Sequence, residues 1–359
     1  MPPDPVVAKQ VTKQVEYLPL GLLAVGNDGW SEWGFVEVPQ HARYVAIRVT
    51  PDVADPTKQP CLRLEPVVTG TGRTLVETST AQTGDRPTCD ACSERVYSSQ
   101  TYGLFVFPTG WEALPGPDSL RLRARFRDCL LQIPVSRARI PALAQELILE
   151  WAWEPALPEA QRGTLHVRLA LAADVPLDDL PEVSRAQIRM IFDSAGIDVD
   201  FDVVTRLSVG GELDAAGPMQ NSWFADAMTR LSAGPRDVRF APVVLASCLS
   251  SAVGPTPLGF TSRIPGGISP TNGSSAVYVA AACGGQQSLG DLDLGTVVAH
   301  ELGHYLGLYH SDEAEGARLA EPGAEIMRAR PVGLPSDFLR FSAGQILAAR
   351  RHPDLVFSR

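Results

Sequence analysis

The chain has 359 residues, which is long enough for two domains with separate cores. Its formal net charge is −10, from 41 acidic and 31 basic residues, and this argues against nucleic acid and anionic membrane surfaces as partners. No apolar run reaches the about 18 residues that suggest a transmembrane segment.

The first part of the chain, residues 1–156, is predicted to be a β-rich accessory domain with a β-sandwich-like fold. Short alternating or apolar runs recur between clusters of Pro, Gly, Asn and Asp, which is typical of strands separated by turns. The expected strands are residues 35–38, 44–49, 102–107, 119–126 and 146–153.

Five of the six tryptophans fall in this first part: Trp30, Trp33, Trp111, Trp151 and Trp153. Aromatic side chains in a β-rich domain usually pack in its core or pair across strands. If exposed, they also suit a face that binds sugars or proteins, so an adhesion or carbohydrate-binding role for this domain stays open.

The chain contains six cysteines: Cys61, Cys89, Cys92, Cys129, Cys248 and Cys283. The even count favours disulfides and an oxidising compartment. The expected location is therefore secreted, cell-surface or periplasmic, with a leader absent from this chain, because its first residues lack the basic start of a signal peptide. Two alternatives remain. Cys89 and Cys92 could form a zinc knuckle with Cys61 and Cys129, or Cys89 could cap a catalytic metal and keep an enzyme latent.

Residues 157–162 are predicted to be a linker, and residues 163–359 a second domain with a mixed twisted sheet. Strands are expected at residues 165–171, 199–204, 240–246, 258–261 and 276–281, and helices at 181–195 and 222–231. Residues 342–345 read as a capping box that opens a last helix ending near residue 351. Cys248 and Cys283 each follow an apolar strand, so we expect them to be bonded to each other.

The most informative stretch is residues 300–310, which reads H-E-x-x-H-x-x-G-x-x-H. His300 and His304 are one helical turn apart, so both can reach one metal ion. Gly307 can take the positive φ that ends a helix, after which the chain can swing His310 back toward the metal. Three protein ligands leave one position open, which is typical of catalytic zinc. Glu301 lies beside this face, where it can act on a zinc-bound water.

The stretch resembles the signature of the metzincin zinc metallopeptidases, and every fixed position of that signature is matched. The resemblance implies a zincin fold for about residues 163–350, with Zn²⁺ held by the three histidines and Glu301 as the catalytic base. It also implies a tight turn with a methionine below the metal, for which Met327 is the candidate. Some metzincins place a tyrosine ligand two residues after this methionine, but Ala329 stands there.

The predicted fold class is thus α+β, with an N-terminal β-sandwich-like domain followed by a metzincin-like catalytic domain. The predicted function is that of a zinc-dependent endopeptidase acting on a protein or peptide. Its substrate is expected to lie along a cleft rim formed by Leu258, Gly259, Phe260 and Thr261. An adhesion protein with secondary proteolysis and a zinc hydrolase of a non-peptide amide remain as alternatives. The oligomeric state and the natural substrate stay undetermined.

Overall fold

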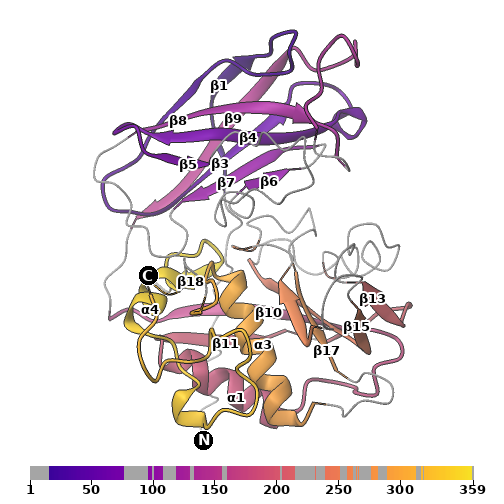
Figure 1. Cartoon of the computed structure of the whole chain (residues 1–359), viewed down its shortest axis with the longest axis vertical. Coiled ribbons are helices and arrows are strands. Elements are labelled where there is room, and N and C mark those ends of the chain that lie inside the picture. The colour runs from indigo at the N-terminus through magenta and orange to yellow at the C-terminus, as the bar shows by residue number, and fades with distance from the viewer. Residues whose placement is uncertain are drawn as a thin grey trace, which may run out of the picture.

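The computed structural model shows an α+β protein whose described residues form two halves, called here the N-terminal half (16–155) and the C-terminal half (160–357) (Figure 1). The described residues are 16–76, 96–98, 101–107, 119–129, 133–155, 160–202, 204–214, 231, 239–250, 257–261, 264, 266, 276–281, 289–312, 317 and 319–357. Within this part of the chain, no helix is both long and apolar enough to cross a bilayer.

The N-terminal half consists of two antiparallel sheets. The five-stranded sheet runs in the order β1 (Leu18–Ala24), β9 (Glu146–Pro155), β3 (Ala42–Pro51), β7 (Gly103–Phe107), β6 (Val96–Ser98). The four-stranded sheet runs in the order β2 (Gly34–Glu37), β8 (Ser119–Arg127), β4 (Cys61–Thr69), β5 (Thr74–Val76). A short 3-10 helix, η1 (Pro56–Lys58), lies between β3 and β4.

One hydrophobic core joins the two sheets. It takes Val45, Ile47 and Phe105 from the five-stranded sheet and Leu62 and Leu122 from the four-stranded sheet, all of them fully buried. The strands alternate because successive side chains point to opposite faces of a sheet, so every second residue enters this core. The expected strands are present, although the sequence pattern had not indicated β1, β4, β5 or β6.

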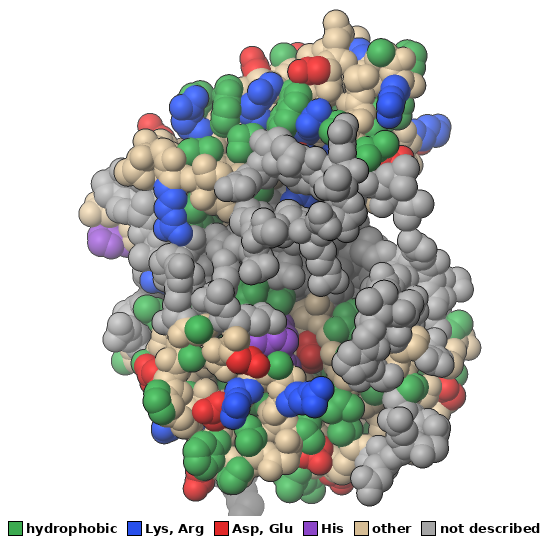
Figure 2. All heavy atoms as spheres, viewed as in Figure 1, with side chains coloured by type: hydrophobic (Ala, Val, Ile, Leu, Met, Phe, Trp, Pro, Cys, Tyr) green, Lys and Arg blue, Asp and Glu red, His purple; other side chains and the backbone are tan. Residues whose placement is uncertain are grey.

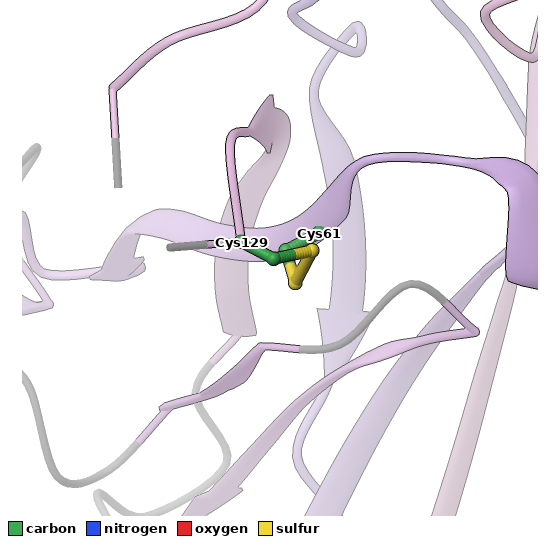
Figure 3. The surroundings of a disulfide bond; sticks show 2 residues. All are labelled: Cys61 and Cys129. Atoms are coloured by element: carbon green, nitrogen blue, oxygen red, sulfur yellow. A yellow bond between two sulfur atoms is a disulfide. The ribbon is translucent and has the colours of Figure 1, made fainter. Parts of the chain in front are cut away.

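A disulfide between Cys61 and Cys129 fastens one end of the four-stranded sheet (Figure 3). Cys61 opens β4, and Cys129 follows the end of the neighbouring strand β8, with 4.9 Å between the two Cα atoms. Since both sulfur atoms are bonded to each other, the alternative of a zinc knuckle that uses Cys61 and Cys129 is wrong. Cys89 and Cys92, including the proposed latency role of Cys89, lie outside the described residues.

The C-terminal half is built on a mostly parallel sheet. The strands β11 (Ile197–Phe201), β10 (Gly163–Leu171), β14 (Ala241–Ala246) and β17 (Val277–Ala280) are parallel, and β16 (Gly259–Thr261) is antiparallel at the edge. Two further strands, β12 (Thr205–Arg206) and β18 (Leu355–Phe357), pair with β10, and β13 (Glu212–Asp214) pairs separately with β15 (Cys248–Ser250). The strands β14 and β17 read as short apolar runs without polar residues because both faces of the sheet are covered there.

Two helices, α1 (Glu182–Asp193) and α3 (Asp291–Tyr305), pack against each other. A Cβ atom on Gly295 of α3 would lie 2.7 Å from the carbonyl oxygen of Ser184, so only glycine permits this close approach. The 3-10 helix η4 (Ser336–Phe338) and the helix α4 (Ala343–Ala349) follow, and α4 opens with the predicted capping box between Ser342 and Gln345. The helix expected at residues 222–231 lies almost entirely outside the described residues.

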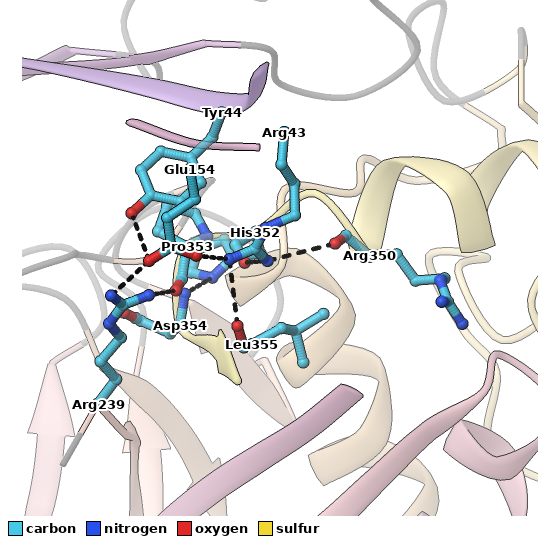
Figure 4. A network of polar contacts seen from close by, with 9 residues as sticks. All are labelled: Arg43, Tyr44, Glu154, Arg239, Arg350, His352, Pro353, Asp354 and Leu355. Atoms are coloured by element: carbon cyan, nitrogen blue, oxygen red, sulfur yellow. Dashed lines mark hydrogen bonds and ion pairs between the residues drawn. The ribbon is translucent and has the colours of Figure 1, made fainter. Parts of the chain in front are cut away.

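A buried polar cluster joins the two halves (Figure 4). Arg43 of β3 donates to the carbonyl oxygen of His352 at 2.7 Å and pairs with Glu154 of β9 at 2.5 Å. Arg239, which precedes β14, pairs with the same Glu154 at 2.5 Å and donates to the carbonyl oxygen of Pro353 at 2.7 Å. The carboxylate of Glu154 therefore lies between two guanidinium groups, one from each half.

Candidate metal centre and active site

The helix α3 places His300 and His304 on one face, as their spacing predicts, and the other side of the helix is buried. Val298, Ala299, Leu302 and Tyr305 are each fully shielded from solvent, because they pack in the core of the C-terminal half. The two histidines therefore come from a helix that is held along most of its surface, which fixes the direction in which their rings point.

The end of α3 turns His310 toward the two helical histidines. Gly307 has a φ of 96°, which favours glycine. Its N–H donates to the carbonyl oxygen of His304, and the N–H of Leu308 donates to that of Gly303, which is the hydrogen-bond pattern of a Schellman motif. The predicted helix stop at Gly307 is thus confirmed, and the chain returns His310 to the site.

The three histidines converge on one point. Their Nε2 atoms lie 3.2 Å apart between His300 and His310, 3.1 Å between His300 and His304, and 3.0 Å between His304 and His310. Among the described residues, this is the group of side chains that could hold a metal ion. In Figure 2, histidine side chains are visible near the middle of the molecule, where the two halves meet.

The protonation of two of the rings shows what these nitrogens can bind. Nδ1 of His300 lies 2.7 Å from the carbonyl oxygen of Ile326. Nδ1 of His304 lies 2.6 Å from that of Leu308. Because a carbonyl oxygen only accepts, each Nδ1 carries the ring proton and each Nε2 presents a bare lone pair. Lone pairs that face each other at this distance need a cation between them.

Zinc fits this arrangement. Tetrahedral zinc with nitrogen ligands at about 2.0–2.1 Å separates those nitrogens by roughly 3.3–3.4 Å, which is close to the observed spacing. Burial lowers the pKa of His300 to about 4 and that of His304 well below its usual value, so both rings are neutral near pH 7. The His300, His304 and His310 triad could bind zinc, and the first two of these rings would not have to lose protons for it.

Glu301 is buried next to the histidines and is held from above by the edge strand β16. The hydroxyl of Thr261 lies 2.8 Å from Oε2 of Glu301 and 2.7 Å from its backbone oxygen, and can donate to either. A Cβ atom on Gly259 would lie 2.8 Å from Cγ of Glu301, so β16 passes directly against this side chain. Burial raises the pKa of Glu301 to about 8, against the opposing effect of the Thr261 hydrogen bond.

Met327 lies in a tight turn that packs against Gly303 of α3. The turn is closed by the N–H of Arg328, which donates to the carbonyl oxygen of Glu325, and the Met327 side chain is fully buried. Its Sδ atom would be 2.4 Å from a Cβ atom on Gly303, so the glycine gives the sulfur room against α3. The carbonyl oxygen of Met327 also accepts from the N–H of Ser311, just after the third histidine.

The remaining residues predicted from the sequence belong to the expected rim of the substrate cleft and to the expected Cys248–Cys283 disulfide. Gly259, Phe260 and Thr261 form β16, and Leu258 directly before it is exposed. Cys248, at the start of β15, is disulfide-bonded, but Cys283 lies outside the described residues, so the pairing of these two stays a prediction.

The sequence did not indicate the groups that orient the site. The backbone carbonyl oxygens of Ile326 and Leu308 hold the two histidine rings, and a backbone group cannot be recognised from the residue type. Tyr305, which follows His304, donates to Asp354 at 2.5 Å, and these two residues are 49 positions apart. Only the third histidine and the glycine before it hinted that the chain must fold back here.

Comparison with known protein families and with curated proteins finds no match. Solved structures share part of the fold. Archaemetzincin from Methanopyrus kandleri has a TM-score of 0.33 and 16% identity, and the match covers 55% of this chain and 98% of that one. Metalloproteinase-II from Bacteroides fragilis has a TM-score of 0.36 and 15% identity over 55% of this chain and 60% of that one. A zinc-dependent peptidase from Methanocorpusculum labreanum has a TM-score of 0.33 and 14% identity over 51% of this chain and 99% of that one. These similarities are remote and concern about half of the chain.

Proposed function

We propose that the protein is a zinc-dependent endopeptidase. The observation that carries this proposal is the convergence of three Nε2 atoms within 3.2 Å of one another, beside the buried carboxyl group of Glu301. Bound to these nitrogens, zinc would supply a Lewis acid that polarises a carbonyl group and acidifies water. The three histidines would hold the metal.

Glu301 acts as the proton-transfer group. It directly follows the first ligand, His300, on the same helix, so we place its carboxyl group at the reacting atoms and not on the metal. It takes the proton of the attacking water and passes that proton to the leaving amine. Thr261 holds the carboxyl group in place, and the buried surroundings keep bulk water away from this proton.

The substrate lies along β16 in an extended conformation. Because β16 is at the edge of the described sheet, a peptide can add to it by main-chain hydrogen bonds. The cleft rim is then Leu258, Gly259, Phe260 and Thr261, while residues 328–337 wall the pocket beyond the scissile bond. Met327 forms the floor under the histidines, as in the metzincins, and the chain is divided into an accessory domain (1–156), a linker (157–162) and a catalytic domain (163–359).

Digestion of a diverse peptide pool, with cleavage sites read by mass spectrometry, tests the activity. Wild type is expected to cut internal peptide bonds, and a chelator abolishes cleavage until zinc is restored. The E301Q variant should retain about one zinc per chain and lose turnover. The double variant H300A/H304A should lose both. A zinc-loaded wild type that cleaves no peptide but hydrolyses small amides would replace this proposal by the non-peptide alternative.

We also propose that the protein functions in an oxidising compartment, outside the cytoplasm. The Cys61–Cys129 bond and the bonded state of Cys248 support this, since such bonds persist where thiols are not kept reduced. Non-reducing peptide mapping is expected to yield a linked Cys248–Cys283 peptide. Pairing of Cys248 with Cys89 or Cys92 would contradict that assignment.

A further inference from the structure

The outer face of the four-stranded sheet carries a row of arginines flanked by aromatic rings. Along β8, Leu120, Leu122 and Ala124 point into the core, and the residues between them point outward. We call this surface the arginine–aromatic face. It consists of Arg121, Arg123, Arg125, Trp30, Trp33 and Phe35.

Each of the three arginines makes a cation–π contact with an aromatic ring. The guanidinium carbon of Arg121 lies 4.9 Å from the ring centre of Trp33, and that of Arg123 lies 4.9 Å from the ring centre of Trp30. Arg125 lies over the same Trp30 ring at 4.5 Å. Stacking fixes the guanidinium planes in advance, so less conformational entropy is lost when their N–H groups bind a ligand.

These arginines have no acidic partner. Within the described residues, no carboxylate forms an ion pair with Arg121, Arg123 or Arg125, although the chain has ten more acidic than basic residues. Their neighbour Arg127 behaves differently, since it is buried and pairs with the buried Glu65. Three guanidinium groups in a row, none in an ion pair with a described carboxylate, therefore present a local positive charge on an otherwise acidic protein.

The face is open and turned away from the metal centre. Phe35 is 61% exposed and Trp33 is 37% exposed. The other sheet of the N-terminal half supplies Arg43 and Glu154 to the cluster with the C-terminal half, so the arginine–aromatic face is on the opposite side. Figure 2 shows Lys and Arg side chains interleaved with hydrophobic ones over the N-terminal half.

We infer that the arginine–aromatic face binds an acidic polysaccharide. Alternate residues of a strand are about 6.6–6.8 Å apart, so the row offers regularly spaced forked donors to the carboxylate or sulfate groups of an extended, stiff polymer. Arginines already cover the tryptophan rings, which leaves few of the free stacking platforms that single-stranded nucleic acids use. The disulfide in this half fits surroundings in which polysaccharides are met.

Binding of fluorescent hexasaccharides to the full zinc-loaded protein tests the inference. The probes are a galacturonic acid hexamer and a sulfated heparin hexamer, which separate carboxylate from sulfate as the anion, with cellohexaose as the neutral probe. Wild type is expected to bind at least one acidic hexamer and not cellohexaose. The variant R121S/R123S/R125S should lower that affinity about tenfold or more.

Two further variants complete the design. R162S/R189S/R340S removes the same number of charges from the C-terminal half and should change affinity by about twofold or less. R121K/R123K/R125K keeps the charge but removes the paired guanidinium donors. Because these side chains face outward, it should fold like wild type and bind more weakly. Absence of binding, equal loss in both serine variants, or tighter binding of a thymidine hexanucleotide or a hexaglutamate peptide would overturn the assignment.

Discussion

Thr261 is the side chain that orients Glu301, since among the described residues no other side chain donates to that carboxyl group. We predict that T261V keeps zinc bound but lowers kcat about tenfold or more, with little change in KM. The reason is that a hydrogen bond contributes about 1.5–3 kcal/mol when its acceptor is charged, and the form of Glu301 that can accept a proton in turnover is the ionised carboxylate. Steady-state kinetics and metal analysis measure both quantities.

The matched variant is T261S, which keeps the hydroxyl and removes only a methyl group. It should recover most of the lost kcat, because the donor remains. Full activity in T261V would show that Glu301 needs no positioning partner.

Buried titratable groups give the zinc-free protein a distinct pH dependence. Burial lowers the pKa of His300 to about 4 and that of His352 to about 3. It also lowers the pKa of His304 well below its usual value. The unfolded state therefore binds more protons as pH falls below about 6.5, and stability decreases in that direction.

Burial also raises the pKa of Glu301 to about 8 and that of Asp354 to about 7. In the folded state these carboxyl groups keep their protons up to a higher pH than in the unfolded state. Their contribution to stability therefore decreases as pH rises toward the folded-state pKa values.

We therefore predict that the zinc-free protein is most stable at about pH 6. Urea unfolding midpoints between pH 4.5 and 8.5 check this. In H352L, the decrease on the acidic side should be shallower, because one proton fewer is taken up on unfolding. A midpoint that changes in one direction only across the whole range would contradict the assignment of these groups.

At the scale of elements, the contact between α1 and α3 depends on a single missing side chain. We predict that G295A lowers the free energy of unfolding by about 1–3 kcal/mol, although alanine favours a helix by about 1 kcal/mol. The added Cβ would lie 2.7 Å from the backbone oxygen and 2.9 Å from the Cα of Ser184, and backbone atoms cannot move aside without separating the helices. Chemical denaturation measures the loss.

The control for this variant is G290A. Gly290 precedes the same helix, and nothing lies within 4 Å of the Cβ position there. It should leave stability within about 0.5 kcal/mol of wild type. An equal loss in both variants would mean that the helix start, and not the contact between helices, is sensitive.

The elements that could be predicted are those whose signal is local. The histidine spacing predicts the helix α3, which ends just before the expected glycine. The capping box predicts the start of α4. The strand β4 was missed because Pro66 interrupts its apolar run, and β18 because three residues carry no usable pattern. Such strands form through pairing with distant partners, so their own sequence contains little of the reason for them.

At the scale of the whole molecule, Glu154 is the group on which the contact between the halves depends. We predict that E154L lowers the free energy of unfolding by about 3 kcal/mol. Arg43, which is 4% exposed in its side chain, and Arg239 would be left close together without their shared carboxylate. Burial opposes ionisation of Glu154, but the two guanidinium groups outweigh it and lower its pKa, so the carboxylate is charged near pH 7.

The matched variant is E150L, which removes the partner of Arg48 on the same pair of strands. In that ion pair the arginine is more exposed than Arg43 or Arg239, and only one arginine is involved, so a loss of about 1 kcal/mol or less is expected. Similar losses in the two variants would mean that the cluster between the halves contributes no more than a surface pair.

The metal site could be predicted from the sequence in most of its parts, but the cluster between the halves could not. The ligands lie within eleven consecutive residues, so a local pattern defines them. Arg43 and His352, by contrast, are 309 positions apart, and neither residue differs in sequence context from a surface arginine or histidine. Contacts of this kind are decided by how the two finished halves fit together.

The segment 352–357 determines how the protein would respond to proteolytic removal of these residues. It pairs with β10 through β18, receives the hydrogen bonds of Arg43 and Arg239 on its carbonyl oxygens, and contacts the residue after His304 through Asp354. An exopeptidase that trimmed the chain back to Arg351 would remove none of the metal ligands. It would nevertheless remove carbonyl oxygens that accept from Arg43 across the two halves, so the contact between the halves would weaken while all three histidines remained.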